Sequence, residues 1–120
     1  MARILLADDD AATRDLVQRA LAIDGHDVTP TQDGSEALDA INAAPAGFDL
    51  LISDVQMPAL DGVALAEQAL AVAPGLRVIL MSGFADELGR AGHLKGKLAR
   101  VIIKPFTLDQ IRTTVKAVLG

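Results

Sequence analysis

The chain has 120 residues, which suits one domain with one hydrophobic core, and 51% of them are hydrophobic, which argues against disorder. It has no cysteine, which excludes disulfides and a thiol nucleophile, and no apolar run approaches the roughly 20 residues of a membrane span. The net charge of −5, the lack of Trp and Tyr and the lack of a signal peptide predict a cytoplasmic protein with no DNA or membrane partner.

The first half of the chain alternates predicted strands with predicted helices. Residues 3–7 form an apolar run that predicts a buried strand, and three aspartates follow it directly. A second, short strand at residues 27–31 contains Pro30, whose nitrogen cannot donate a hydrogen bond to a neighbouring strand, so we expect it at an edge of the sheet. Two helices complete this half, one between the capping residue Asp10 and Gly25 and one between the capping residue Asp33 and Pro45.

The second half repeats the alternation. A third strand at residues 49–53 ends in Asp54, and a turn segment with Pro58 and Gly62 follows. Residues 84–96 include three glycines, each of which costs about 1 kcal/mol of helix propensity, so we expect only a short, loosely held helix there. The remaining predicted elements are a helix from about Val63 to Val72, strands at 77–81 and 99–103, and a last helix that begins at a Thr107–Gln110 capping box.

Apolar strands without polar alternation predict an α/β fold, a parallel sheet covered by helices on both faces. The flavodoxin-like (βα)5 order 2-1-3-4-5 places the strand with Pro30 at an edge and its switch point between the first and third strands. Ligands of such sheets bind at the carboxyl ends of the strands beside the switch point, and here those ends are Asp8, Asp9 and Asp54. We therefore expect one domain, residues 1–120, with its site at this edge.

The residues at this edge suit phosphoryl transfer. Converging carboxylates raise one another's pKa unless a cation binds, and oxygen ligands without His or Cys favour Mg²⁺. The next two strands bring Ser82, a hydroxyl donor, and Lys104, a compact cation, to the same edge. Each piece alone has a simpler explanation as a cap, a turn or a strand end, but their joint placement predicts that Asp54 is the nucleophile and forms an aspartyl phosphate.

The chain resembles, from end to end, a bacterial response-regulator receiver domain of the CheY-like family. The resemblance rests on four motifs: ILLADDD at 4–10, ISDVQMPALDG at 52–62, MSG at 81–83 and IKPF at 103–106. It implies that Asp54 accepts its phosphoryl group from a histidine kinase or a histidine phosphotransfer protein, and that Ser82 and Lys104 contact the phosphoryl oxygens. It also implies a cis peptide before Pro105 and a Mg²⁺ ion held by Asp9, by Asp8 through water, by Asp54 and by the carbonyl of Gln56.

One position departs from this family. Three residues before the lysine the family usually has a Tyr or Phe that swings inward on phosphorylation, whereas this chain has Val101. We therefore expect the switch to depend on Ser82, on the loop after the fourth strand and on the glycine-rich helix, with the ring of Phe84 as a substitute. The expected switch residues are Ser82, Gly83, Phe84, Val101 and Pro105.

The charges indicate a surface for partner proteins. Residues 1–67 contain 13 acidic and 3 basic side chains, whereas residues 68–120 contain 3 acidic and 8 basic ones. We expect the downstream protein on the face formed by the helix at residues 84–96, the strand at 99–103 and the last helix. We expect the phosphodonor on the helix after Asp10. We expect no DNA-binding or catalytic output domain after the last helix. Within the family the chain is similar to stand-alone receivers of the CpdR type, which act as adaptors to an ATP-dependent protease. The basic residues of the expected partner face are Arg90, Lys95, Lys97, Arg100, Arg112 and Lys116.

Two other functions fit parts of the sequence. A Mg²⁺-dependent phosphatase or phosphotransferase could also use an aspartyl phosphate, but it would need a separate acid-base residue and a substrate-binding cap, and neither is evident. A receiver that has become a constitutive binding module would not need its acceptor residues, and all of them are present. We therefore expect a phospho-accepting regulator rather than a separate enzyme.

Overall fold

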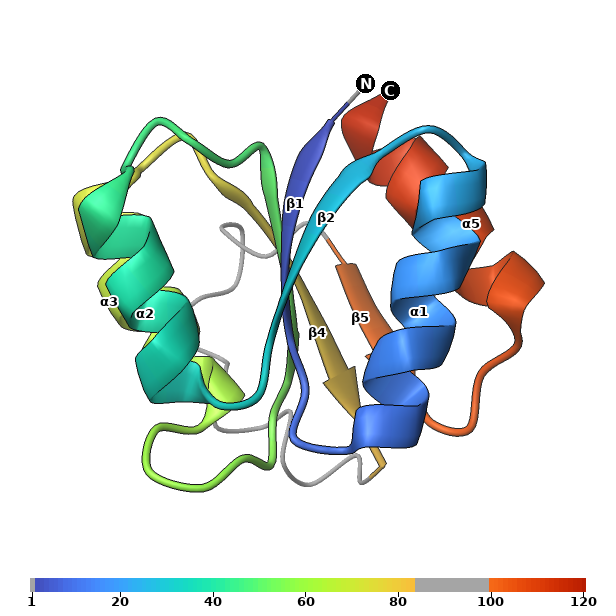
Figure 1. Ribbon diagram of the computed structural model, residues 1–120, viewed down its shortest axis with the longest axis horizontal. Coiled ribbons are helices and arrows are strands. Elements are labelled where there is room, and N and C mark those ends of the chain that lie inside the picture. The colour runs from blue at the N-terminus through green and yellow to red at the C-terminus, as the bar shows by residue number, and fades with distance from the viewer. Residues whose placement is uncertain (1, 84–99) are drawn as a thin grey trace.

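The computed structural model describes residues 2–83 and 100–120 and has the predicted five-stranded parallel sheet in the order β2-β1-β3-β4-β5. Figure 1 shows α2 and α3 on one face of the sheet and α1 and α5 on the other. The strands are β1 (Arg3–Ala7), β2 (Asp27–Thr31), β3 (Leu50–Asp54), β4 (Arg77–Ser82) and β5 (Arg100–Ile103). The described helices are α1 (Ala11–Ile23), α2 (Gly34–Ala43), α3 (Gly62–Val72) and α5 (Leu108–Leu119).

Alternate residues of the central strands pack on opposite faces of the sheet. Leu5 and Leu51 pack with α2 and α3, whereas Ile4, Leu6 and Ile52 pack with α1 and α5. Both sides are therefore apolar, which explains why β1 and β3 read as continuous hydrophobic runs. The strand with Pro30 lies at the edge of the sheet, as predicted, and both caps predicted in the first half of the chain, together with the Thr107–Gln110 capping box, are present.

A few boundaries and inward positions differ from the prediction. β3 extends to Asp54 and β4 to Ser82, each one residue later than the apolar run suggests, because backbone pairing continues under the polar side chains. In α1 the helical spacing of Leu16, Val17, Ala20 and Leu21 predicts an apolar side made of all four, but Leu16 is 49% exposed because the other three face the sheet. The loosely held helix expected at residues 84–96, and Ala99 of the last strand, lie outside the described residues.

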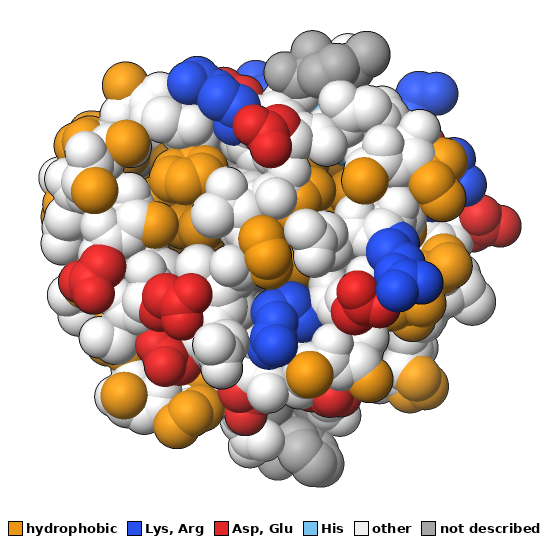
Figure 2. All heavy atoms as spheres, viewed as in Figure 1, with side chains coloured by type: hydrophobic (Ala, Val, Ile, Leu, Met, Phe, Trp, Pro, Cys, Tyr) orange, Lys and Arg blue, Asp and Glu red, His pale blue; other side chains and the backbone are white. Residues whose placement is uncertain are grey.

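The two faces also differ in charge. On the side of the molecule seen in Figure 2, acidic side chains gather over α2, whereas basic and acidic side chains lie beside one another toward α1 and α5. In the parts of the chain that the structure describes, no helix has the length and apolar character needed to cross a bilayer.

Candidate functional site

The acidic residues that the sequence singled out meet at the carboxyl edge of the sheet. β1 and β3 are neighbours with Ala7 paired to Ser53, so the residues after these partners, Asp8 and Asp54, come to the same level of the sheet. Asp9 joins them, and one carboxylate oxygen from each of the three residues lies within 4.8 Å of the other two. The register of two parallel strands thus assembles the cluster, as the switch-point prediction required.

Asp8 is the most deeply buried member of the cluster, with no exposed surface. Its Oδ1 accepts a hydrogen bond from the backbone N–H of Asp10 at 2.9 Å, whereas its Oδ2 has no hydrogen-bond partner among the described residues. Burial raises the pKa of this carboxyl, and the backbone hydrogen bond and Lys104 oppose that rise only in part. A buried carboxylate oxygen without a donor, beside two further carboxylates, is a suitable ligand for a hard cation.

Asp54 lies at the end of β3 and contacts the ammonium group of Lys104. Its Oδ2 accepts a hydrogen bond from Lys104 Nζ at 2.9 Å, and the same Nζ lies 4.0 Å from Asp8 Oδ2. Burial raises the pKa of Asp54, the hydrogen bond from Lys104 opposes this, and the charge of Asp9 adds to the rise. Burial lowers the pKa of Lys104, but the hydrogen bond and charge of Asp54 outweigh it, so the ammonium form is favoured.

The backbone places Lys104 at this edge. Its N–H donates to the carbonyl of Ser82 at 2.7 Å, which joins the ends of β4 and β5, and the peptide bond to Pro105 is cis, as the family resemblance implied. Ser82 itself is buried at the end of β4 and pairs with Ile103. The ends of β3, β4 and β5 therefore bring together the acceptor, the hydroxyl and the cation that the sequence predicted.

The loop after Asp54 folds back against its own strand. Gly62 donates its N–H to the carbonyl of Val55 at 2.8 Å, and a Cβ at Gly62 would lie 2.2 Å from the carbonyl oxygen of Asp54. Only a glycine allows the chain to approach the acceptor residue this closely. Gln56 lies in this loop with an exposed side chain, and the role of its carbonyl as a metal ligand stays a prediction.

The expected switch residues lie partly within the described chain. Val101 is paired with Leu80 of β4 and is 39% exposed, and the glycine at position 83 directly follows β4. Phe84, the proposed substitute for the missing aromatic ring, lies outside the described residues. The switch mechanism therefore stays a prediction.

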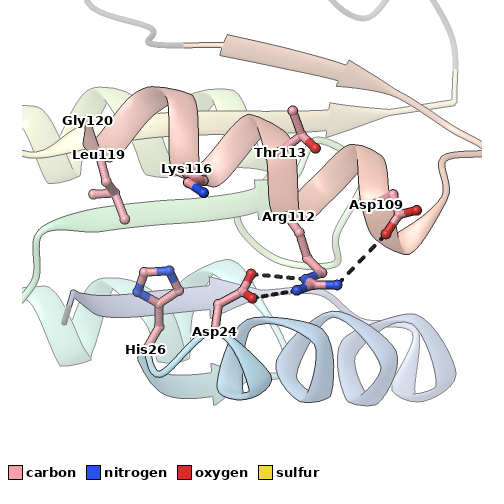
Figure 3. A pocket seen from close by; sticks show the side chains of 8 residues that line it. All are labelled: Asp24, His26, Asp109, Arg112, Thr113, Lys116, Leu119 and Gly120. Carbon is pink, nitrogen blue, oxygen red and sulfur yellow. Dashed lines mark hydrogen bonds and ion pairs between the residues drawn. The ribbon is translucent and has the colours of Figure 1, made fainter.

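Of the basic residues expected on the partner face, the structure describes Arg100, Arg112 and Lys116. Arg112 donates two hydrogen bonds to Asp24, at 2.6 and 3.0 Å, and with Lys116 lines a pocket of about 530 Å³ between α5 and the end of α1 (Figure 3). The groove between β5 and α5 is lined by residues 101–103, 109, 110, 113 and 114. Residues three or four apart share a face of a helix, so Gln110 and Thr114 face this groove, whereas Arg112 and Lys116 face the pocket beside α1. Arg100 is exposed on β5, and Arg90, Lys95 and Lys97 lie outside the described residues.

The sequence analysis did not identify one further residue at the site, Arg14. Its Nη1 donates a hydrogen bond to the carbonyl oxygen of Asp8 at 2.7 Å. The only signal in the sequence is position: a long donor in the second turn of a helix capped by Asp10 can reach back to the loop before it. Arg14 thus contacts the acidic loop through its backbone.

Comparisons with known proteins agree with this geometry. The family model described as "Response regulator receiver domain" matches residues 4–116. The chain is 34% identical to the response regulator receiver protein CpdR of Brucella abortus (strain 2308) and covers 98% of it; 99% of this chain is aligned. It is also 34% identical to the response regulator MprA of Mycobacterium sp. (strain KMS), over 98% of this chain but only half of MprA.

Solved structures show the same similarity. The response regulator TrrA from Thermotoga maritima, in complex with Mg(2+)-BeF, superposes with a TM-score of 0.85 at 25% identity, over 98% of this chain and 99% of TrrA. A CheY-like receiver domain protein from Methanospirillum hungatei JF-1 gives a TM-score of 0.87 at 27% identity, over 98% of this chain and 92% of that one. With the sheet order and the acidic edge described above, these matches show that the chain belongs to the response-regulator receiver family of two-component signalling.

Proposed function

We propose that Asp54 accepts a phosphoryl group from a histidine kinase or a histidine phosphotransfer protein, and that Mg²⁺ is required. One observation supports this most directly: Asp54 Oδ2 contacts Lys104 at 2.9 Å, while the adjacent Asp8 has a buried oxygen that no described residue hydrogen-bonds. The nucleophile thus lies beside both a fixed cation and a set of oxygen ligands. In the transfer, an Asp54 oxygen forms a bond to phosphorus as the phosphorus–nitrogen bond of the donor imidazole breaks.

Several residues around Asp54 would neutralise the negative charge of the phosphoryl oxygens. Asp8, Asp9, Asp54 and the carbonyl of Gln56 would hold Mg²⁺, because the cluster offers oxygen ligands within 4.8 Å of one another. When bound, Mg²⁺ supplies positive charge next to the phosphoryl oxygens. Lys104 then donates to a phosphoryl oxygen instead of to the carboxylate, and Ser82, buried at the end of the neighbouring strand, donates its hydroxyl to another.

The same contacts suggest how phosphorylation would reach a partner protein. The N–H of Lys104 donates to Ser82, so a shift of either residue toward the phosphoryl group moves the ends of β4 and β5 together. The adjacent groove between β5 and α5 presents Val101 and Ile103, which are 39% and 48% exposed. We place the downstream protein at this groove, and the phosphodonor at α1, which begins directly after the acidic loop.

The test is phosphorylation by a small donor, acetyl phosphate, with and without Mg²⁺, followed by intact mass spectrometry. We expect one phosphoryl group per chain, stable to acid and labile to base, that requires Mg²⁺ and is lost in Asp54→Asn. Asp49→Asn is the matched control, since Asp49 precedes the same strand at its opposite end and pairs with Arg3. Labelling that persists in Asp54→Asn, or continuous turnover of the donor without a labelled chain, would refute the proposal; no labelling at all would indicate a constitutive binding module.

A further inference from the structure

Arg14 is placed by its own helix to act on the acidic loop. Asp10 caps α1 by accepting from Ala12 N at 3.1 Å and from Thr13 Oγ1 at 2.9 Å, and the N–H of Arg14 donates to the carbonyl of Asp10 at 2.9 Å. From this fixed backbone position the half-buried guanidinium reaches back to Asp8 O. The contact therefore adds a second restraint to the loop from Asp8 to Asp10, besides the internal hydrogen bond from Asp10 N–H to Asp8 Oδ1.

The atom to which Arg14 donates is informative, because it belongs to the main chain and not to a carboxylate. Three carboxylates lie at this edge, and among the described residues Arg14 forms no ion pair with any of them; its guanidinium donates to a main-chain carbonyl instead. A guanidinium on a carboxylate would occupy an oxygen that a metal needs. A guanidinium on the carbonyl leaves Asp8 Oδ2 without a hydrogen-bond partner and restrains the peptide that connects Asp8 to Asp9.

We propose that Arg14 is a positioning residue for the metal site, which fixes the loop from Asp8 to Asp10 so that both carboxylates can bind one Mg²⁺ ion. The inference rests on the proposed function, since it assumes that these carboxylates bind a divalent cation. Outer residues that orient metal ligands commonly change metal affinity by about 10- to 100-fold when they are removed. Arg14 has the geometry of such a residue without contacting the ion.

The direction in which Mg²⁺ affinity changes when Arg14 is removed separates a positioning role from a purely electrostatic one. If Arg14 acted only as a positive charge near the site, its removal would relieve repulsion of Mg²⁺ and tighten binding. If it positions the loop, its removal releases Asp8 and Asp9 and weakens binding. The two explanations therefore predict opposite changes in affinity.

The experiment measures Mg²⁺ binding to the full chain by isothermal titration calorimetry for Arg14→Ala, Arg14→Lys and Arg19→Ala. Arg19 is the matched control, on the same helix in an ion pair with Asp15 at 3.0 Å whose side chains are 76% and 57% exposed. We expect about a 10-fold loss of affinity in Arg14→Ala, partial recovery in Arg14→Lys, whose ammonium can still donate, and no change in Arg19→Ala.

A second measurement separates positioning from folding and from chemistry. Phosphorylation of Asp54 by acetyl phosphate at saturating Mg²⁺ should return to the wild-type rate in Arg14→Ala, because the defect lies in metal binding alone. Unchanged or tighter Mg²⁺ binding, or a labelling defect that saturating Mg²⁺ does not correct, would overturn the role of Arg14. A wild-type chain that binds no Mg²⁺ would instead overturn the proposed function on which the inference rests.

Discussion

Replacing Asp8 with Asn should stabilise the metal-free protein. Asp8 is fully buried, and its Oδ2 has no hydrogen-bond partner among the described residues. The substitution keeps Oδ1 as the acceptor for the N–H of Asp10 and puts an amide donor in the place of the unpaired oxygen, facing the carboxylates of Asp9 and Asp54. The side chain keeps its volume, so the change tests charge and hydrogen bonding rather than packing.

Burial is the largest influence on Asp8, and the charges around it act in both directions. At an effective dielectric constant of about 20, attraction to Lys104 at 4.0 Å amounts to about 4 kcal/mol. Repulsion from Asp54, at no more than 4.8 Å, amounts to about 3.5 kcal/mol on the same scale, and the exposed carboxylate of Asp9 adds a repulsion that solvent weakens. What remains is the cost of a buried, unpaired carboxylate oxygen, so we expect Asp8→Asn to raise the free energy of unfolding by about 1 to 3 kcal/mol.

The pH dependence has a defined sign. Burial raises the pKa of Asp8 above 3.8 in the native state, so between the two values the native protein binds more protons than the unfolded chain. The stability of the wild type therefore falls as the pH rises through the native pKa. The advantage of Asp8→Asn should be complete above that pKa and disappear as the pH falls toward 3.8.

Urea unfolding followed by far-ultraviolet circular dichroism measures this difference, because the chain has no Trp or Tyr to report by fluorescence. In EDTA at neutral pH the variant should be the more stable protein. At a Mg²⁺ concentration about 100 times its Kd, the wild type should gain about 2.7 kcal/mol and the variant less. A variant that is less stable than the wild type in EDTA, or that gains as much from Mg²⁺, would contradict the reasoning.

Two further substitutions test the surroundings of the acceptor. Lys104→Met should slow labelling by acetyl phosphate about 100-fold, as loss of one charge-stabilising donor typically does, and should tighten Mg²⁺ binding because a competing cation leaves; an unchanged labelling rate would count against the role of Lys104. Gly62→Ala should cost about 3 kcal/mol or more by urea unfolding and reduce labelling, because its Cβ would lie 2.2 Å from the carbonyl oxygen of Asp54. Gly75→Ala is the control, since a Cβ there has no atom within 4 Å, and an equal loss in both variants would show that the close approach is unimportant.

The fold was predictable because its causes are local and repeated. Apolar runs of strand length alternate with capped amphipathic helices, and Pro30 assigns its strand to an edge of the sheet. Right-handed crossovers leave few strand orders, and the flavodoxin-like order among them, which puts the Pro30 strand at an edge, is the one observed. The errors came where sequence neighbours compete for one face of a helix: Leu16 and Val17 are adjacent and equally apolar, and only the packing of α1 on the sheet decides which of them is buried.

The candidate site was predictable in its residues but not in their contacts. Asp8, Asp9, Asp54, Ser82 and Lys104 come from strand ends, and parallel pairing brings such ends together whatever the side chains are. Contacts made by long side chains cannot be read in this way. The hydrogen bond from Arg14 to the Asp8 carbonyl depends on a rotamer that sequence spacing does not specify.

The direction of the charged side chains on α5 was likewise not predictable from the sequence. The net excess of basic residues in the second half of the chain indicates a basic surface, but charge per segment does not specify which face of a helix a side chain occupies. In α5, Arg112 points toward α1 and pairs with Asp24, whose pKa this pairing lowers. The groove beside β5 is formed by Val101, Ile103 and polar residues on another face of α5, among them Gln110 and Thr114. Recognition at this groove would therefore rest on shape and apolar contact, with charge from α5 acting on the other side of the helix, where it holds α5 against α1.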